Sequence, residues 1–514
     1  MLVHQMQEFT FEGPVLTNAW AAPQVAAEFS SAEETVRVKG FYDGEGIYKV
    51  RFLPEKAGSY TWQVNGAVSG RGSVYCSAGE KRGKVSASSQ HFIYANGSLY
   101  QSFGTTVYGL VHQPEALIEK TLRSLEASPY NKVRMCLFPK YYEYNREEPE
   151  AFPFEKTDAG VFDVQRPCLK YWQRLDRVLD RLEAMDIQAD LILFHPYDKW
   201  GFSKMSMEDN LIYLETVIRR LAARPNVWWS LANEYDVLTA FEMEDWYTVE
   251  DFMTRCDPFH HLLSNHNWAK FYDFSREHIT HVCVQFPWVQ KAGLLAHEYQ
   301  KPVIFDEMGY EGNVPMGWGN LSAFELVNRF WCVCAQGAWA THGEAFVSED
   351  QVLWWSKGGN LKGASTPRIA WLRKFMESLP GPLEADLLPL AVNDMPPDKD
   401  TAEALFAQMP EEFQGFARAM VSLSPLERER MVLADPMYSG HCGTDAYLYY
   451  YARTCPCMAH IELPGDGGYK VEVLDVWEMT RYTAMENAQG SVTVRLPSKE
   501  GIAVCAVRTG AHLL

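Results

Sequence analysis

Two glutamates in the chain each follow a run of apolar residues, a position that suits catalysis. The segment NVWWSLANEYD places Asn233 and Glu234 after one such run, and KPVIFDEMGYEG places Asp306 and Glu307 after another. Burying a carboxylate is costly unless it has a partner or a role. Cleavage of a glycosidic bond uses two carboxyl groups, one that protonates the leaving oxygen and one that attacks the sugar or activates water. Glu234 and Glu307 are therefore the candidate pair for this chemistry if the fold brings them together.

Other polar and aromatic side chains follow the remaining apolar runs. Glu344 is a third glutamate in such a position, and we assign it to binding sugar hydroxyls, because one carboxylate can accept hydrogen bonds from two neighbouring hydroxyls. Trp354 or Trp355 is expected to form a platform beneath a sugar. For His195, the orientation of a hydroxyl or a carboxylate competes with a structural role, which is the more common one for an isolated histidine at the end of a strand. Core packing is the competing interpretation for each aromatic residue. The other candidates are Asp198, Trp200, His266, Asn267, Gln285, Tyr310 and His342.

These residues meet if the chain between residues 90 and 380 forms a (β/α)8 barrel. Apolar strands alternate there with amphipathic helices such as YWQRLDRVLDRLEAM, which is typical of βα units around a parallel sheet. Eight strands over roughly 290 residues fit such a barrel, whose active site lies at the carboxyl ends of the strands. A doubly wound sheet is the alternative, but no G-x-G-x-x-G turn follows the first strand. The expected strands are Leu99–Thr105, Lys132–Phe138, Ile187–Phe194, Val227–Ala232, Leu262–Asn265, Val282–Phe286, Val303–Phe305 and Ala338–His342.

Two β-rich regions flank the predicted barrel. Residues 1–89 contain short alternating stretches, including IYKVRFLP and YTWQVNG, separated by Gly, Pro and Asn, which predicts a β-sandwich. Residues 381–514 begin with a helical portion, TAEALFAQMPEEFQGFARAM, and continue with strand patterns such as YKVEVLDVWE. We therefore expect an α/β chain, in which a (β/α)8 TIM barrel at residues 90–380 lies between an N-terminal β-sandwich and a C-terminal β-sandwich-like domain.

Composition limits the kinds of partner. The chain of 514 residues has a formal net charge of −19 and no run of Lys or Arg, which disfavours nucleic acid and acidic membrane surfaces. A small neutral carbohydrate fits better, and 16 Trp and 26 Tyr residues supply rings that can stack on it. Eleven cysteines without a paired Cys/His spacing predict reduced thiols, no metal and no cofactor. No signal-peptide pattern and no long apolar run is present, so we expect a cytoplasmic protein, and nothing in the sequence excludes a homo-oligomer.

Four segments, in order, resemble the clan A glycoside hydrolases, which are retaining enzymes on (β/α)8 barrels. LILFHPYDKWGFSKM, WWSLANEYD, VIFDEMGYEG and GAWATHGEAF are similar to barrels related to apiosidase and other plant-glycan hydrolases. The stretch VKGFYDGEGIYKVRFLPEKAGSYTWQV is similar to the β-sandwich that often precedes those barrels. The resemblance covers most of the chain, and the C-terminal region matches more loosely.

The resemblance implies roles for particular residues. Glu234 would be the general acid/base and Glu307 the nucleophile, with carboxyl groups about 5–5.5 Å apart in a retaining enzyme. Glu234 must then hold a proton at neutral pH while Glu307 does not, which requires a donor or a cation beside Glu307. Arg134 matches the arginine that supports the nucleophile in this clan, and Asn233 matches the amide that donates to the sugar 2-hydroxyl. The alternatives are a structural salt bridge for Arg134 and a strand-end cap for Asn233.

One feature of the clan is missing from the sequence. The clan usually supplies a tyrosine beside the nucleophile from the sixth strand, but the segment VCVQFPW contains none. Gln285 or Tyr310 is expected to take that place.

Two other classes of function remain as alternatives. A non-catalytic carbohydrate-binding barrel would need no pair of facing carboxyl groups. A metal-dependent barrel hydrolase would use several His and Asp ligands, but His195, His266 and His342 lack the H-x-H and H-E-x-x-H spacings. The expected substrates of the hydrolase are small plant-type oligosaccharides or glycosides, cleaved at a terminal sugar.

Overall fold

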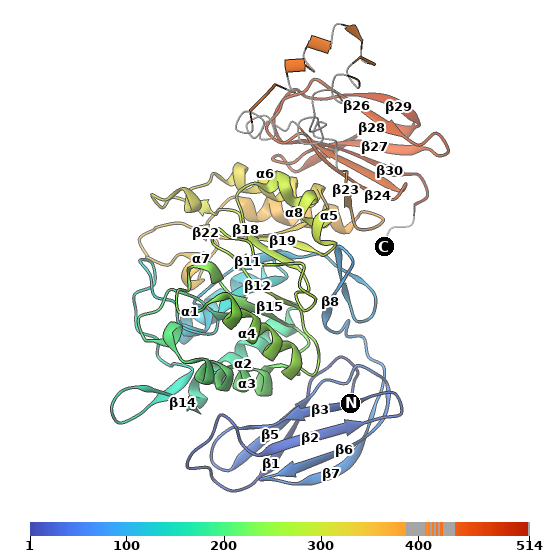
Figure 1. The fold of residues 1–514 in the computed structure, drawn as a ribbon. Coiled ribbons are helices and arrows are strands. Elements are labelled where there is room, and N and C mark those ends of the chain that lie inside the picture. Colours follow the sequence, from blue (N-terminus) through green and yellow to red (C-terminus); the bar gives the residue numbers. More distant parts are fainter. Residues whose placement is uncertain are drawn as a thin grey trace. The chain divides into compact units, whose positions relative to one another are not determined.

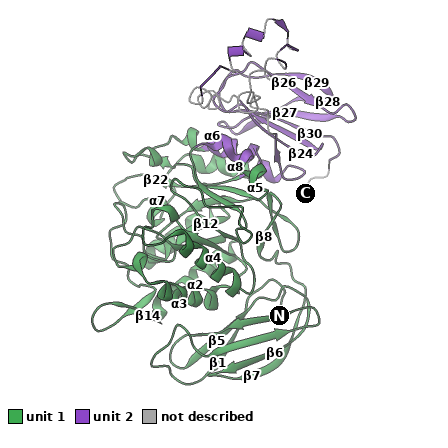
Figure 2. Ribbon diagram, in the orientation of Figure 1, with its two compact units in different colours: residues 1–287, 295–326, 339–373 green, residues 288–294, 327–338, 374–514 purple. Residues whose placement is uncertain are grey.

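The computed structural model describes residues 1–386 and 437–511, together with isolated positions between residues 404 and 424. Its contacts divide the chain into two compact units (Figure 2). The helical portion expected at residues 401–420 lies largely outside the described residues. One unit consists of Met1–Pro287, Leu295–Leu326 and Trp339–Arg373, and the other of Trp288–Leu294, Val327–Ala338 and Lys374–Leu514.

The N-terminal region is a sandwich of two antiparallel sheets (Figure 1), with strand orders β1-β5-β4 and β3-β2-β6-β7. Alternate residues of β2 are buried, as expected for a strand with one face on a partner sheet. Phe29 of one sheet stacks on Phe52 of the other, with ring centroids 4.1 Å apart. The strands are β1 (Gln7–Glu12), β2 (Val25–Ser30), β3 (Thr35–Lys39), β4 (Phe41–Tyr42), β5 (Ile47–Phe52), β6 (Gly58–Gly66) and β7 (Gly70–Cys76).

A buried cluster of ion pairs joins this sandwich to the region that follows it in the same unit. Arg51 of β5 donates to Asp176 at 2.8 Å and to the backbone carbonyl of Arg220 at 2.6 Å. Asp176 also pairs with the side chains of Arg220 and Arg224. Burial alone would raise the pKa of Asp176, but the surrounding guanidinium groups, led by Arg220 and Arg51, hold it well below its usual value.

The predicted (β/α)8 barrel is confirmed by eight parallel strands in the order β17-β16-β15-β12-β11-β21-β19-β18. Every residue of β15 and β16 is buried, because side chains fill the barrel on one face of each strand and helices cover the other. The barrel strands are β11 (Phe103–Thr106), β12 (Lys132–Cys136), β15 (Gln188–Phe194), β16 (Val227–Ala232), β17 (Leu263–Ser264), β18 (Val282–Gln285), β19 (Val303–Glu307) and β21 (Trp339–His342).

The two strands at the ends of this order, β17 and β18, are joined largely through side chains. The Ser264 hydroxyl donates to the carbonyl of His281 at 2.7 Å. The Asn267 amide exchanges two hydrogen bonds with the backbone of Gln285, at 3.1 and 3.2 Å. These contacts close the barrel at its seam, the junction between its fifth and sixth strands.

The first predicted strand, Leu99–Thr105, is wrong in its extent. Leu99 and Tyr100 form β10 (Leu99–Tyr100), which belongs to a separate antiparallel sheet of order β10-β9-β8, and the barrel strand begins only at Phe103. The Asn131 side chain accepts the Phe103 N–H at 2.8 Å and donates to the carbonyl of Gln101 at 2.7 Å. Those bonds hold the chain between the two strands. The other members of the small sheet, β8 (Val85–Ser88) and β9 (His91–Tyr94), lie on either side of the expected domain boundary at residue 89.

Helices follow the barrel strands, and several begin at recognisable caps. Ser206 accepts the Asp209 N–H at 3.1 Å at the start of α3, and Glu242 and Asp245 form a capping box at the start of α4. Among the described helices, none is both long and apolar enough to span a membrane. The α-helices are α1 (Glu115–Glu126), α2 (Leu169–Ala184), α3 (Met207–Leu221), α4 (Met243–Cys256), α5 (Ala292–Tyr299), α6 (Ala323–Ala335), α7 (Trp354–Lys357) and α8 (Ser365–Glu377).

Short elements lie in the loops between the strands and helices of the barrel. The strands are β13 (Phe154–Lys156), β14 (Phe162–Pro167), β20 (Glu311–Gly312) and β22 (Glu344–Ala345). The 3-10 turns are η1 (Leu110–His112), η2 (Phe202–Lys204), η3 (Tyr235–Val237), η4 (Val289–Lys291) and η5 (Gly317–Gly319).

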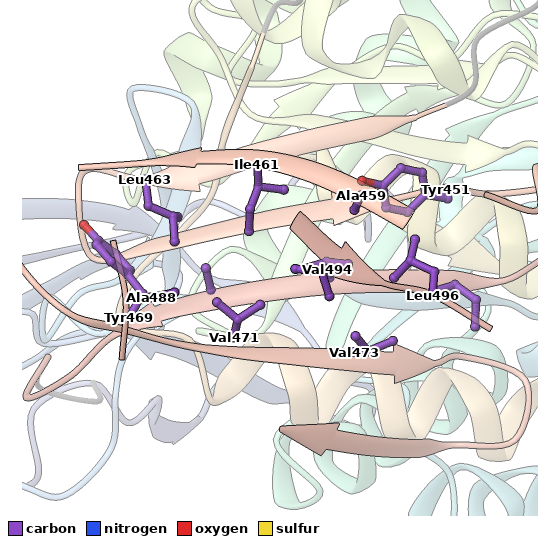
Figure 3. Packing of buried hydrophobic residues seen from close by; sticks show 13 residues of the cluster. Tyr451, Ala459, Ile461, Leu463, Tyr469, Val471, Val473, Ala488, Val494 and Leu496 are labelled. Atoms are coloured by element: carbon purple, nitrogen blue, oxygen red, sulfur yellow. The ribbon is translucent and has the colours of Figure 1, made fainter. Parts of the chain in front are cut away.

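The C-terminal region is the second predicted β-domain. A sheet of order β23-β24-β25-β30-β27-β28 is accompanied by the antiparallel pair β26-β29. Figure 3 shows Ile461 and Val494 of the pair and Val471 and Val473 of the larger sheet in one buried apolar cluster. The strands are β23 (Glu384–Ala385), β24 (Tyr438–Cys442), β25 (Ala446–Tyr450), β26 (Met458–Leu463), β27 (Tyr469–Asp475), β28 (Thr480–Ala488), β29 (Gly490–Arg495) and β30 (Ile502–Arg508).

Candidate active site

Glu234 and Glu307 lie at the carboxyl ends of β16 and β19, and one side chain contacts both. Gln285, the last residue of β18, brings one end of its side-chain amide to 3.0 Å from Glu234 Oε1 and 3.2 Å from Glu307 Oε2, and because both of these oxygens are acceptors the amide nitrogen is assigned to that end. Because both oxygens lie within hydrogen-bonding distance of the same nitrogen, they are at most about 6 Å apart. The structure thus brings the two predicted carboxyl groups together across a narrow gap.

A tyrosine from the first barrel strand holds Glu307. Tyr108 follows β11, and its hydroxyl donates to Glu307 Oε1 and lies 2.7 Å from Asn233 Oδ1. Burial, and then the charge of Glu307, raise the pKa of Tyr108 well above its usual value, so this hydroxyl keeps its proton. Asn233 Nδ2 is buried and has no hydrogen-bond partner among the described residues. The donors of that amide are therefore unused by the described residues.

The backbone at Glu234 is strained. Its φ and ψ angles are 57° and 59°, in the left-handed region that residues other than Gly rarely adopt. The neighbouring residues are held firmly, since Asn233 N–H donates to the Phe194 carbonyl at 2.9 Å and Tyr235 N–H to the His266 carbonyl at 2.8 Å. Such strain concentrates at functional sites, where the surrounding structure maintains it.

The surroundings of Glu234 suit a proton donor. Burial, and then the charge of Glu307, raise its pKa to about 7, although Lys140 and hydrogen bonds from Tyr197 and Gln285 act in the opposite direction. The Tyr197 hydroxyl donates to Glu234 Oε2. A carboxyl group with a pKa near neutrality can both give up and take back a proton at physiological pH.

Sequence reasoning missed three residues beside the two glutamates. Tyr108, Tyr197 and Lys140 each follow a barrel strand by two to four residues, after β11, β15 and β12 respectively. The strand-end position is a signal that could have found all three. Lys140 is 4% exposed, and its Nζ lies 3.5 Å from the ring centroid of Tyr108 and 4.4 Å from that of Tyr197.

Arg134 belongs to a charged layer inside the barrel. It donates to Asp190 at 3.3 Å and lies 3.8 Å from Asp306, while Lys132 donates to Asp306 at 2.5 Å. In the described part of the chain, the hydrogen bonds of Arg134 go to residues other than Glu307. The predicted support of Glu307 by Arg134 thus stays a prediction. Because Arg134 makes its described hydrogen bonds to other residues, it would act on Glu307 through its charge.

The three predicted histidines face different partners. His195 Nε2 lies 3.1 Å from the carbonyl of Phe138, and His342 Nδ1 lies 3.0 Å from the hydroxyl of Thr105. His266 Nδ1 accepts the backbone N–H of Glu234 at 3.4 Å. Burial lowers the pKa of His195 to about 4, so its ring is neutral at physiological pH. Among residues 1–386 and the other described positions, no group of three or more His, Cys, Asp or Glu side chains could hold a metal ion.

Glu344 and Trp354 are engaged by the protein itself. The Glu344 carboxylate accepts the backbone N–H groups of Lys362 and Gly363, at 2.7 and 2.9 Å. Trp354 is buried, and its indole N–H donates to the Thr105 hydroxyl at 2.8 Å. Their predicted contacts with a sugar remain predictions.

Trp355 lies in an aromatic wall close to the glutamates. Its ring centroid is 6.3 Å from that of Tyr108, 6.2 Å from that of Tyr310 and 4.9 Å from that of Trp318. Trp355 is only 6% exposed, whereas Trp318 is 39% exposed, so Trp318 offers the accessible ring. The pKa of Tyr310 is raised by burial and by Glu307, which places this tyrosine near the predicted nucleophile.

The loop after β15 is stabilised by its own aspartate. Asp198 accepts the backbone N–H groups of Trp200, Gly201 and Ser203 at 2.8 to 3.2 Å. The Trp200 indole donates to Glu148 at 2.8 Å. Both predicted residues therefore shape this loop.

A family model described as the apiosidase-like catalytic domain matches residues 86–380. The chain belongs to the apiosidase-like family. It is therefore an enzyme of the glycoside hydrolase class, as the sequence resemblance predicted. Two further models, described only as domains of unknown function, match residues 3–67 and 435–507 of this apiosidase-like protein. The search of curated proteins finds no match.

One solved structure agrees with the assignment to the glycoside hydrolases, and a second shares the fold. A Bacteroides vulgatus protein assigned as a glycoside hydrolase is 30% identical, and the match covers 98% of this chain and 99% of that one with a TM-score of 0.84. A glycoside hydrolase family 5 protein from the same organism is 14% identical, with coverage of 84% and 95% and a TM-score of 0.59. The second likeness shows only that the apiosidase-like chain shares the fold.

Proposed function

We propose that this apiosidase-like protein is a retaining glycosidase that removes terminal sugars from small plant-type oligosaccharides or glycosides. The observation that carries the proposal is the shared contact of Gln285 with Glu234 and Glu307, which limits the distance between the contacted oxygens to about 6 Å. Retaining enzymes hold their two carboxyl groups about 5–5.5 Å apart, whereas inverting enzymes leave about 6.5–9.5 Å for a water molecule. The narrow gap favours double displacement.

In the first step, protonated Glu234 gives its proton to the glycosidic oxygen. The Glu307 carboxylate attacks the anomeric carbon, the bond to the leaving oxygen breaks, and a glycosyl ester with Glu307 forms. In the second step, the Glu234 carboxylate takes a proton from water, whose oxygen attacks the same carbon and releases Glu307. Glu234 ends protonated, so the enzyme is ready for another cycle.

The surrounding residues support both steps. Hydrogen bonds from Tyr108 and Gln285 reach the two oxygens of Glu307 and hold its carboxyl group in one orientation. Asn233 Nδ2, which lacks a partner in the described structure, donates to the sugar 2-hydroxyl, and this bond strengthens as the transition state develops positive charge. The exposed face of Trp318 provides a ring against which the sugar can stack.

The proposal is tested with a panel of nitrophenyl glycosides on the wild type, Glu307→Ala and Glu234→Ala. We expect Glu307→Ala to lose turnover and to regain it with azide, giving a glycosyl azide of inverted configuration. Glu234→Ala should keep more activity on substrates with good leaving groups than on those with poor ones, because only the latter need protonation. NMR of the first wild-type product should show the substrate's anomeric configuration.

Tyr213→Phe is a suitable control for these variants. It removes a buried hydroxyl that donates to the Leu193 carbonyl at 3.2 Å, remote in function from the two glutamates. Its turnover should match that of the wild type. Unchanged turnover in both glutamate variants, or a first product of inverted configuration, would reject the proposal.

A further inference from the structure

Lys140 contacts both tyrosines that hold the two glutamates. Its ammonium lies 3.5 Å from the ring centroid of Tyr108 and 4.4 Å from that of Tyr197, within the range of cation–π attraction. The Tyr108 hydroxyl donates to Glu307, and the Tyr197 hydroxyl donates to Glu234. One cation therefore packs on both rings whose hydroxyl groups fix the two carboxylates.

Lys140 does not take part in an ordinary structural ion pair. Lys132, the buried lysine of the charged layer, donates to both Asp306 and Asp190. Lys140 is 4% exposed, against 0% for Lys132, yet no carboxylate of the described chain lies within ion-pair distance of its Nζ. Burial lowers the pKa of Lys140, whereas Cys136 and then the charges of Glu234 and Glu307 act to raise it. The aromatic rings and the two glutamates thus offset part of the free-energy cost of burying this charge.

We propose that Lys140 is a positioning residue of the hydrolytic site: it holds Tyr108 and Tyr197 in place on the two carboxylates and sets one positive charge beside both. The inference rests on the proposed roles of Glu234 and Glu307. The backbone around Lys140 is fixed for this purpose, since the Asn145 amide donates to its carbonyl at 2.7 Å. The next N–H, that of Tyr141, donates to the carbonyl of Tyr197 at 2.9 Å.

The charge of Lys140 has a defined effect on the proton donor. Burial and Glu307 raise the pKa of Glu234, whereas Lys140 lowers it, so loss of the lysine charge raises that pKa further. Because Glu234 must be protonated for the first step, the alkaline limb of kcat/KM then moves to higher pH. The titratable or charged groups and aromatic rings that face Lys140 are Cys136, Arg134, His195, His266, Tyr108, Tyr142 and Tyr197, in addition to the two glutamates.

The test compares the pH profiles of kcat/KM for Lys140→Met, Lys140→Gln and Lys140→Arg with that of the wild type, on a glycoside that needs acid assistance. Both neutral variants should move the alkaline limb upward by about half a pH unit to one unit, as expected for loss of a neighbouring charge. Lys140→Arg keeps the charge and should leave the limb near its wild-type position. A residue that only stabilised the fold would lower kcat without moving the limb.

The inference is overturned if the neutral variants keep the wild-type limb, or if Lys140→Arg moves it as far as they do. Loss of turnover in Glu307→Ala is established first, so failure of the inference leaves the proposed function intact. If neither neutral variant folds, the reciprocal measurement decides. Glu234→Gln should lower the pKa of the Lys140 ammonium, read by NMR of lysines labelled at Cε, because coupling between two sites is mutual. An unchanged pKa of Lys140 would overturn the inference.

Discussion

At the scale of single residues, the two glutamates of the site differ in what surrounds them. Glu307 accepts hydrogen bonds from the Tyr108 hydroxyl and from the Gln285 amide, on different oxygens. Glu234 shares Gln285 but is largely buried, and burial is the main cause of its raised pKa. The surroundings of Glu234 thus suit the proton donor of the proposed mechanism.

The first prediction concerns the pH dependence of activity. We expect kcat/KM to fall as the pH rises through about 7, because Glu234 must be protonated and its pKa is raised to about 7. The profile should be measured with a substrate whose leaving group is poor. A dinitrophenyl glycoside is the matched control, since its leaving group needs little protonation and its limb should be weak. A limb for the poor substrate near the ordinary pKa of a glutamate would contradict the assignment.

The second prediction concerns the tyrosine that the sequence did not single out. Tyr108→Phe removes the hydroxyl that donates to Glu307, and we expect kcat to fall by about ten- to a hundredfold, because a hydrogen bond to a charged group contributes about 1.5–3 kcal/mol. Steady-state kinetics on a nitrophenyl glycoside measures the loss. Tyr213→Phe, which also loses a buried hydroxyl, should retain its kcat. Equal rates for the two variants would show that the Tyr108 hydroxyl has no part in turnover.

At the scale of elements, strands β12, β15 and β19 share a charged layer within the barrel. Lys132 and Arg134 of β12 pair with Asp190 of β15 and Asp306 of β19, and all four side chains are at most 4% exposed. Removing one partner from such a layer leaves a buried charge without compensation.

The third prediction follows from that layer. Lys132→Met should lower the free energy of unfolding by about 3–5 kcal/mol, because Asp306 loses its closest cation. Urea unfolding followed by circular dichroism measures the change. The control is Arg37→Ala, which breaks an exposed pair with Glu28 whose side chains are 78% and 46% exposed, and it should cost about 1 kcal/mol or less. A loss for Lys132→Met as small as that of the control would show that the layer adds little to stability.

The sequence predicted the strands, the helices and the two glutamates better than it predicted the side-chain contacts around them. Glu234 and Glu307 were predictable because each follows a long apolar run and parallel strands end at the same edge. Lys140 and Tyr197 also follow strands, which marks their positions, but lysine and tyrosine are common in ordinary loops, so their contacts at the site could not be predicted. The partners of Arg134 depend on the register of three strands, and the extent of the first strand depends on the distant side chain of Asn131. Both are tertiary contacts, which a local pattern does not contain.

At the scale of the whole molecule, the two compact units have separate apolar cores. Leu191 is buried in the barrel, and Ile461 is buried in the core of the C-terminal β-domain. Units with separate cores can unfold in separate steps.

The fourth prediction is therefore that core mutations act on different transitions. Leu191→Ala and Ile461→Ala should each cost about 2–5 kcal/mol, but in different unfolding steps. Differential scanning calorimetry, with activity followed in parallel, separates the two effects. Activity should disappear with the transition that Leu191→Ala lowers, and Ile461→Ala should leave kcat unchanged at low temperature. A single transition lowered equally by both changes would contradict this independence.

The seam of the barrel has a mechanical consequence. The Asn267 side chain forms two hydrogen bonds with the backbone of Gln285 across the junction of β17 and β18, and the side chain of Gln285 contacts both glutamates. If β17 and β18 move apart at this junction, the side-chain amide of Gln285 moves with them. The two hydrogen bonds of Asn267 therefore help to keep the distance between the two carboxyl groups constant. In Asn267→Ala, the amide hydrogen of Gln285 should exchange faster with solvent deuterium, and turnover should fall although neither glutamate has changed.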